Sequence, residues 1–298
     1  MPWTPDIIPD QSGRIAIVTG SNSGIGLHTA RILAEKGAHV VMACRNLDKA
    51  NTAAEIMRNN NAGIKLSVEH LDLSDLSNVL AFSEQYKARN QNLDLLINNA
   101  GIMIPPYSQT TAGAELQFAT NHLGHFALTG QLIDTLRATP HSRVVTVSSL
   151  AHRRGRIRFE DLNWSRSYSP WGAYGQSKLA NLLFCFELDR RLRLTQATTT
   201  SVAAHPGFTS TNITAGSSWM HSAAPLFAQP AEWGAWPTLL AATAIEATGG
   251  SFWGPRWGLW GAPRRVSSSG RSRNTNTAAR LWTCSEELSG VHYLSTPD

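Results

Sequence analysis

Tyr174 and Lys178 are the two residues whose types and spacing most directly suggest chemistry. They lie in the segment 171–181 and form a Tyr-x-x-x-Lys pattern. In a helix, residues four apart lie one turn apart on the same face. A free tyrosine titrates near pKa ~10, too high for acid–base work at neutral pH, and a nearby ammonium group lowers that value. The pair is suited to proton transfer, although Tyr and Lys also fall four apart by chance in many chains.

A glycine-rich turn between two apolar runs indicates a dinucleotide-binding unit. We expect a buried parallel strand over 14–19, a helix over 25–36 and a second strand over 39–43. Glycines let a pyrophosphate approach the backbone, and the helix N-terminus offers free N–H groups and a positive dipole end. The spacing is a three-glycine variant distinct from the commoner G-x-G-x-x-G, and the alternative is a structural turn with no ligand. The turn residues predicted to bind cofactor are Gly20, Asn22, Ser23, Gly24, Ile25 and Gly26.

The end of the second predicted strand bears on the choice of cofactor. NAD-binding proteins usually place an acid there, which accepts hydrogen bonds from the ribose. This chain has Cys44, followed by Arg45 and Asn46. An arginine pairs well with the 2′-phosphate of NADP(H), so we predict that cofactor. The alternative is an ordinary surface arginine.

Further candidate residues follow the next two predicted strands. After the strand 64–70, Asp72 is predicted to accept from the adenine amino group beside Leu73, or else Asp72 or Ser74 caps the following helix. After the strand 93–97, the small residues Asn99, Ala100 and Gly101 would let a cofactor lie against the backbone.

A long helix is predicted over 115–136, with Asn121 in its middle. Asparagine is a poor residue inside a helix because its amide competes for backbone hydrogen bonds. Its presence indicates a special role or a local kink. We interpret the neighbouring His122 and His125 as packing or surface residues.

The remaining elements complete an α/β pattern. Strands are expected over 143–147, 198–204 and 250–255, with helices over 170–192, 232–247 and 281–288. We predict a single-domain, Rossmann-type, doubly wound parallel sheet of about seven strands flanked by helices and spanning residues 1–298. Outside these elements we expect a leader over 1–12, a substrate lid over 208–230 and an irregular C-terminal arm over 256–280. Ligands of such sheets lie beyond the carboxyl ends of the strands, where the candidate residues gather.

Composition excludes several classes of protein. The chain has 298 residues, 42% of them hydrophobic and 16% charged, which is typical of a globular domain. Three scattered cysteines suggest neither a disulfide framework nor a metal site, and fit a reducing compartment. With no apolar signal segment at the N-terminus and no apolar run of ~18 residues, we expect a cytoplasmic protein without stable membrane insertion.

Taken together, these motifs resemble the short-chain dehydrogenase/reductase family, and within it the retinol-dehydrogenase-like and WW-domain-oxidoreductase-like branch. The segments 19–26, 98–101, 119–126, 148–162 and 174–183 carry the resemblance. It implies a catalytic tetrad of Asn121, Ser149, Tyr174 and Lys178. It also implies that Tyr174, Lys178, Pro206, Gly207, Thr209 and Thr211 contact the cofactor, and that a homodimer or homotetramer forms through the helices of Asn121 and Tyr174.

The resemblance implies an oxidoreductase, Arg45 indicates a preference for NADP(H), and the apolar residues of the loop 208–230 indicate a small hydrophobic alcohol, aldehyde or ketone as substrate. Tyr174 would be the general acid or base, Ser149 would hydrogen-bond the substrate oxygen, Lys178 would lower the Tyr174 pKa, and Asn121 would anchor a water in a proton relay. The alternative is a dinucleotide-binding regulatory or scaffold protein with idle chemistry. Arginine clusters and a net charge of +5 would allow nucleic-acid or membrane-surface binding, but no binding motif supports it. A sugar-nucleotide epimerase or dehydratase is a further alternative, against which the glycine spacing argues.

Overall fold

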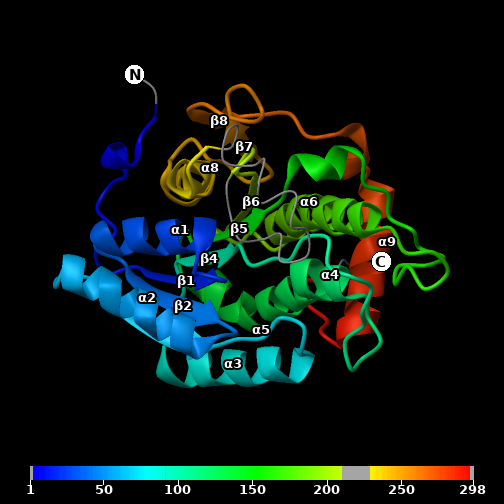
Figure 1. The fold of residues 1–298 in the computed structure, drawn as a ribbon, viewed down its shortest axis with the longest axis horizontal. Coiled ribbons are helices and arrows are strands. Elements are labelled where there is room, and N and C mark those ends of the chain that lie inside the picture. Colours follow the sequence, from blue (N-terminus) through cyan, green and yellow to red (C-terminus); the bar gives the residue numbers. More distant parts are fainter. Residues whose placement is uncertain (1–2, 91, 210–228, 296–298) are drawn as a thin grey trace.

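Eight strands form one sheet with helices on both faces in the computed structural model, which describes residues 3–90, 92–209 and 229–295 (Figure 1). The strand order is β3-β2-β1-β4-β5-β6-β7-β8, and only the β7–β8 pair is antiparallel. The strands are β1 (Ile15–Thr19), β2 (His39–Cys44), β3 (Lys65–His70), β4 (Leu95–Asn98), β5 (Arg143–Val147), β6 (Thr200–Ala204), β7 (Phe252–Pro255) and β8 (Pro263–Arg265). The helices are α1 (Gly24–Glu35), α2 (Leu47–Asn60), α3 (Leu76–Arg89), α4 (Leu116–Phe118), α5 (Gly124–Ala138), α6 (Pro170–Leu194), α8 (Ala231–Thr243) and α9 (Thr275–Ser289).

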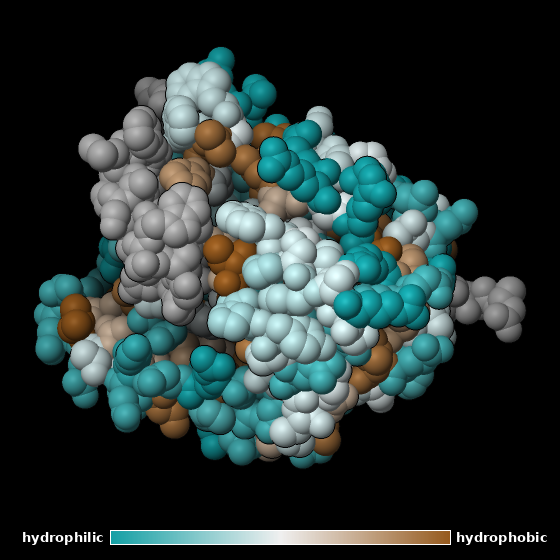
Figure 2. All heavy atoms as spheres, turned by 45° about the vertical axis from the view of Figure 1, so that its right-hand side comes forward, coloured by the Kyte–Doolittle hydropathy of each residue, from teal (hydrophilic) through white to brown (hydrophobic). Residues whose placement is uncertain are grey.

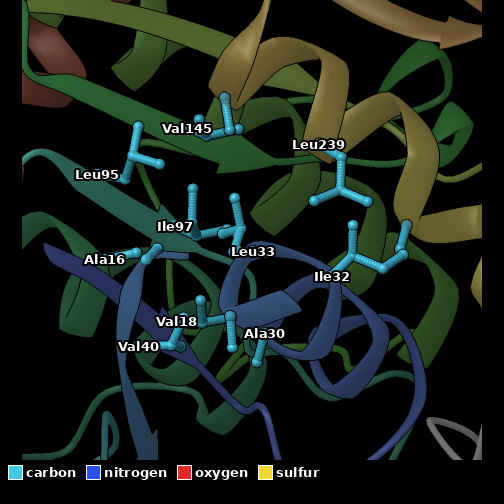
Figure 3. Packing of buried hydrophobic residues seen from close by; sticks show 14 of the residues in the cluster. Ala16, Val18, Ala30, Ile32, Leu33, Val40, Leu95, Ile97, Val145 and Leu239 are labelled. Carbon is cyan, nitrogen blue, oxygen red and sulfur yellow. The ribbon is translucent and has the colours of Figure 1, made fainter. Parts of the chain in front are cut away.

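Apolar side chains on both faces of the sheet hold the two helical layers. On one face, residues of α1, α2 and α8 pack on the central strands, and Figure 3 shows Ile32 of α1 and Leu239 of α8 pointing toward one another. On the other face, residues of α3, α5, α6 and α9 pack on the same strands. Because the central strands are covered on both sides, they read as continuous apolar runs, which is why the sequence predicts them well.

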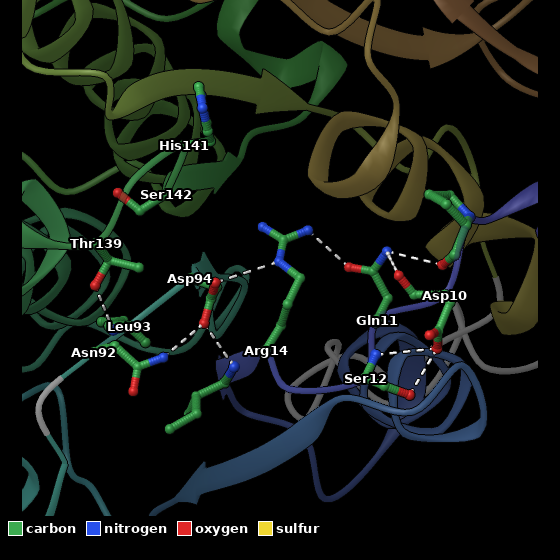
Figure 4. Close-up of polar contacts among 12 residues, drawn as sticks. Asp10, Gln11, Ser12, Arg14, Asn92, Leu93, Asp94, Thr139, His141 and Ser142 are labelled. Atoms are coloured by element: carbon green, nitrogen blue, oxygen red, sulfur yellow. Dashed lines mark hydrogen bonds and ion pairs between the residues drawn. The ribbon is translucent and has the colours of Figure 1, made fainter.

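The predicted leader is tied to the fold where β1 begins. Arg14 donates to the Gln11 side chain at 2.8 Å and pairs with Asp94 at 3.5 Å (Figure 4). Asp94, just before β4, also accepts from the backbone N–H of Ile15 at 2.8 Å. Ile8 is buried within the α1–α8 layer. Two described residues of the leader are therefore joined to the fold, Gln11 to the start of β1 and Ile8 to the α1–α8 layer.

The structure differs from the sequence prediction most clearly in the C-terminal part. The region 256–280, predicted as an irregular arm, contains the short strand β8, a 3-10 turn over Gly270–Arg273 and the start of α9. The sheet therefore has eight strands rather than about seven. A three-residue strand such as β8 leaves no hydrophobic period, and two of its residues are exposed arginines.

Helix α9 covers part of α5 and α6. Trp282 is 2% exposed and packs against Phe126 of α5 and Phe184 of α6, with ring centroids 5.0 and 5.9 Å away. The covered part of these helices is not free to meet a second subunit, so the predicted oligomer would need other surfaces of them. Figure 2, turned toward this side, shows hydrophobic residues scattered among hydrophilic and intermediate ones rather than gathered in one broad patch. In the described part of the chain, no helix combines the length and apolar character that crossing a membrane requires.

Candidate active site

The glycine-rich turn forms a close junction between β1, β4 and α1. Gly20 has a φ of +66°, and a Cβ there would lie 2.9 Å from the Cβ of Ala100. A Cβ on Gly26 would collide with the backbone oxygen of Gly20 and the amide nitrogen of Asn99. Asn99 fixes this contact because its side chain donates to the backbone oxygen of Thr19 at 2.8 Å. The glycines are therefore needed for the packing of the turn itself.

The same turn presents a helix N-terminus that fits a phosphate group. Ser23 is the N-cap of α1, yet its side chain makes no capping hydrogen bond. The Ser23 side chain therefore leaves the first-turn N–H groups uncapped, and with the positive end of the helix dipole they suit a pyrophosphate. Gly20 and Gly24 both have positive φ, which favours glycine, and without a Cβ they leave the backbone open to a dinucleotide. These features fit the dinucleotide that the sequence predicts.

The end of β2 separates a buried cysteine from an exposed arginine. Cys44 is buried, with its sulfur 3.5 Å from the Ser21 hydroxyl, and burial raises the pKa of its thiol. Arg45 is exposed at the carboxyl edge of the sheet. Asn46 is the N-cap of α2, and its side chain accepts from the N–H of Lys49 at 2.9 Å. Arg45 is thus the group beside this strand end that is free to reach toward an anion.

Asp72 lies where it was predicted, but it does not cap the next helix. Its carboxylate accepts from the N–H and hydroxyl of Ser74 at 2.9 and 2.6 Å. The cap of α3 is Asp75, which accepts from the backbone N–H of Ser77 at 2.9 Å. The capping prediction for Asp72 or Ser74 is therefore wrong by one to three residues. Leu73 is buried, and its backbone oxygen occupies the space where a Cβ on Gly124 would lie.

Asn121 sits in a π-helical turn, Ala119–Leu123, between α4 and α5. Its side-chain oxygen accepts from the N–H of Ile102 at 2.8 Å, and its amide donates to the Ile102 oxygen at 3.0 Å and to the Ser177 hydroxyl at 2.9 Å. The predicted continuous helix over 115–136 is therefore interrupted at Asn121, which confirms the expected local irregularity. Such π-turns are rare and occur often at functional sites.

Tyr174 and Lys178 are both buried on α6, one turn apart. The Lys178 ammonium lies 5.8 Å from the Tyr174 ring centroid and donates to the Val147 oxygen at 3.3 Å. Burial lowers the pKa of Lys178 from 10.5 to about 8. Burial raises the pKa of Tyr174 to about 12, and the side chain of Ser149 acts in the opposite direction. The phenol is therefore neutral at physiological pH, because burial dominates the Tyr174 pKa; the net lowering that the sequence predicts from Lys178 is not found.

Gly101 joins these groups into one site. A Cβ on Gly101 would lie 3.1 Å from the side-chain oxygen of Asn121 and 3.3 Å from the Lys178 nitrogen. Ser149, the N-cap of a 3-10 turn that follows β5, lies close enough to Tyr174 to influence its pKa. The structure therefore brings the four residues of the predicted tetrad together at the carboxyl edge of the sheet, beside the glycine-rich turn.

The segment after β6 closes this edge. The N–H of Phe208 donates to the Leu259 oxygen in the β7–β8 loop at 2.8 Å. Gly207 has a φ of +77°, and a Cβ on it would collide with that same oxygen. Thr209 and Ile25 both contact the position a Cβ would take on Gly234 of α8. Pro206, Gly207 and Thr209 thus lie near the glycine-rich turn. Thr211 and most of the predicted lid fall within 210–228, outside the described residues.

Comparison with known proteins agrees with this geometry. A family model described as short chain dehydrogenase matches residues 14–221. The chain belongs to the short-chain dehydrogenase family. It is similar to retinol dehydrogenase 12 of Mus musculus, with 42% identity over 94% of this chain and 88% of that protein, and to human retinol dehydrogenase 12, with 41% identity over the same shares.

Solved structures show the same family fold. A protein from Mycobacterium paratuberculosis has a TM-score of 0.84 and 44% identity, and the match covers 98% of both chains. The Pseudomonas aeruginosa protein RhlG, solved with NADP, has a TM-score of 0.65 and 23% identity over 82% of this chain and 94% of its own. This short-chain dehydrogenase is an NAD(P)-dependent oxidoreductase.

Sequence reasoning missed three residues that support the site of this short-chain dehydrogenase. The Thr19 hydroxyl accepts from the N–H groups of Asn99 and Ala100, both at 2.9 Å. Ser177 holds the Asn121 amide, and the fully buried His125 reaches the Asn121 backbone. The sequence offers one signal for two of them. Ser177 is next to Lys178, and His125 lies four positions after Asn121, so both are close in the chain to predicted tetrad residues.

Proposed function

We propose that this short-chain dehydrogenase is an NADP(H)-preferring oxidoreductase that interconverts hydrophobic alcohols with aldehydes or ketones. The observation that carries the proposal is the meeting of Lys178 and Asn121 at Gly101, with the buried, neutral Tyr174 phenol one helical turn before Lys178 and its ring centroid 5.8 Å from the Lys178 nitrogen. A pure dinucleotide binder has no need of a buried ammonium and a buried phenol one turn apart, since both cost free energy to desolvate.

Tyr174, Ser149 and Lys178 have separate roles in carbonyl reduction. When bound, the nicotinamide supplies the hydride. Tyr174 donates a proton to the oxygen of the substrate, and Ser149 hydrogen-bonds that oxygen as charge develops on it. Lys178, still largely protonated at neutral pH with a pKa of about 8, stabilises the phenolate left behind. In alcohol oxidation the same phenol oxygen takes up the proton.

Arg45 supports a preference for NADP(H). It is exposed next to the buried Cys44, where an acid would favour NAD(H). A guanidinium group makes paired, charge-assisted hydrogen bonds to a phosphate, which NAD(H) lacks at the 2′ position. Asp72, Asn99 and the glycine-rich turn would hold the rest of the dinucleotide.

Two observations support an apolar substrate. The relatives with about 40% identity are named retinol dehydrogenases, and retinol is an apolar alcohol. Trp171 is 55% exposed, and its ring lies edge-on to that of Tyr174, with centroids 6.4 Å apart. An exposed indole beside the proton donor offers an apolar surface to a substrate that reaches the phenol.

The test follows nicotinamide absorbance with NADPH or NADH against a panel of apolar aldehydes and ketones that includes retinal. We expect faster oxidation of NADPH and a loss of about 100-fold or more in Tyr174→Phe. Tyr86→Phe is the matched control, because it removes another buried phenol hydroxyl, bonded to the Asn92 oxygen away from the site. Unchanged turnover in Tyr174→Phe would refute the role of Tyr174. Tight NADPH binding without turnover across the panel would favour the regulatory binder instead.

Cellular location and subunit number belong to the same proposal. We place the enzyme in the cytoplasm, in line with the three free thiols Cys44, Cys185 and Cys284. A homodimer or homotetramer is the expected assembly of the family, and light scattering of the purified protein tests it directly.

A further inference from the structure

His125 links the cofactor-binding turn to the catalytic asparagine through both of its ring nitrogens. It lies on the first turn of α5 and is 1% exposed. Its Nδ1 is 3.1 Å from the backbone oxygen of Asn121, and its Nε2 is 2.9 Å from the Thr19 hydroxyl at the end of β1. One imidazole thus bridges two elements that are 106 positions apart in the sequence.

The neighbouring contacts fix the direction of every hydrogen bond in this bridge. A backbone carbonyl can only accept, so Nδ1 carries the proton and donates to Asn121. Nε2 is then an acceptor. The Thr19 oxygen already accepts from the N–H groups of Asn99 and Ala100, so its own proton is free to be donated to Nε2. The competing Ile97 oxygen is farther from the Thr19 hydroxyl, at 3.3 Å.

Burial keeps this arrangement in one protonation state. The pKa of His125 is lowered to about 4, chiefly because the ring is fully buried. The ring is therefore neutral at physiological pH, with one donor and one acceptor nitrogen, as the bridge requires.

His122, one turn earlier, shows that burial alone does not produce such a bridge. It is equally buried, and its Nε2 contacts the Ser285 hydroxyl of α9 at 2.9 Å. Its Nδ1 has no hydrogen-bond partner in the described part of the chain. His122 packs among Phe118, Phe126 and Phe184, and among the described residues neither of its nitrogens hydrogen-bonds to Asn121 or Thr19.

We infer that His125 is a positioning residue, which holds the Asn121 backbone carbonyl in register with the cofactor-binding residues Asn99 and Ala100 through the Thr19 hydroxyl. The contact lies where the backbone departs from the regular α-helical ladder, in the π-turn at Asn121. A carbonyl held in this way maintains the hydrogen bonds of the Asn121 side chain to Ile102 and Ser177. These bonds place the side chain next to Gly101 and Lys178. The inference rests on the proposed function, since it concerns the placement of a predicted catalytic residue.

The test compares His125→Phe with the matched control His122→Phe. Each variant replaces a buried neutral imidazole by a phenyl ring. Both should therefore change the free energy of unfolding, measured in urea, to a similar degree. For carbonyl reduction with NADPH, we expect kcat to fall about tenfold or more in His125→Phe, with KM for NADPH changed less than about threefold. We expect kcat to stay within about twofold of wild type in His122→Phe.

Two further variants distinguish positioning from a general structural effect. His125→Asn places an amide N–H near the position of Nδ1, so it should recover part of the kcat lost in His125→Phe. Thr19→Val removes the hydroxyl, and combined with His125→Phe it should lower kcat no further than the worse single variant, because both act through one chain of hydrogen bonds.

Each outcome is decisive for one of the two proposals. Equal kcat losses in the His122 and His125 variants, no recovery in His125→Asn, or additive losses with Thr19→Val would overturn the positioning role. Wild-type turnover that survives His125→Phe unchanged would also overturn it while leaving the proposed function intact. A wild-type protein without turnover on any substrate would instead count against the proposed function.

Discussion

Replacing Lys178 by methionine should stabilise the ligand-free protein while abolishing turnover. Methionine has a similar length, is apolar and fills irregular buried space well. The Lys178 ammonium is buried, and among the described residues it donates a hydrogen bond to the Val147 oxygen at 3.3 Å. That oxygen keeps a partner in the variant, because the Asn181 amide also donates to it at 3.1 Å.

The magnitude follows from the Lys178 pKa. Its fall from 10.5 to about 8 corresponds to about 3 kcal/mol, since each pKa unit is worth ~1.4 kcal/mol. Between these values the unfolded chain binds more protons than the native one, so wild-type stability rises with pH across that window. Methionine lacks this dependence. The advantage of Lys178→Met should therefore be about 3 kcal/mol below pH 8 and should fade as pH approaches 10.5.

Urea unfolding at pH 7 and pH 10 measures this difference. The control is Lys49→Met on the exposed side of α2, which should change the free energy of unfolding by less than about 0.5 kcal/mol at either pH. An advantage of equal size at both pH values would show that methionine packing, not relief of a buried charge, is its source. A less stable variant at pH 7 would refute the reasoning outright.

Three other predictions concern the cofactor, the pH profile and the C-terminal helix. Arg45→Asp should raise KM for NADPH about 10- to 100-fold and leave KM for NADH nearly unchanged. The same charge change in Lys87→Asp on α3 should alter neither KM. Equal effects of Arg45→Asp on both cofactors would contradict a 2′-phosphate contact. The rate of carbonyl reduction should be flat near neutral pH and fall above about pH 8, because Lys178 then loses the charge that stabilises the phenolate; a profile still flat at pH 9 would exclude that role. Trp282→Ala should lower the free energy of unfolding by about 3–5 kcal/mol, against less than about 1 kcal/mol for Trp257→Ala, which is 69% exposed.

The sequence predicts the carboxyl edge of the sheet well because the strands that end there follow local patterns. Strands β1, β2 and β5 are apolar and covered on both faces, so their residues reveal them without knowledge of their neighbours. Their ends then place Gly20, Arg45 and Ser149 at one edge by topology alone. The distance of each side chain from its partners is set by packing, so it requires the structure.

The C-terminal part could not be predicted in the same way. Strand β8 has three residues and is held by pairing with β7, so its conformation comes from a partner rather than from its own pattern. Helix α9 begins six residues before the predicted start at 281, because Asn274 caps it and the first turns are polar. The apolar residues Leu281 and Trp282 reveal only the half of the helix that is buried against α5 and α6.

The different roles of the buried His122 and His125 cannot be predicted from the hydrophobic period of the sequence. His122 and His125 have the same residue type and nearly the same burial, and the sequence gives both the same interpretation of packing or surface residue. What separates them is which way each ring points from an interrupted helix. A regular helix would rotate His125 by a different angle relative to Thr19, so the π-turn at Asn121 accounts for the contact of this imidazole with Thr19 at the end of β1. The asparagine that interrupts the helix thus also brings its own supporting residue into place.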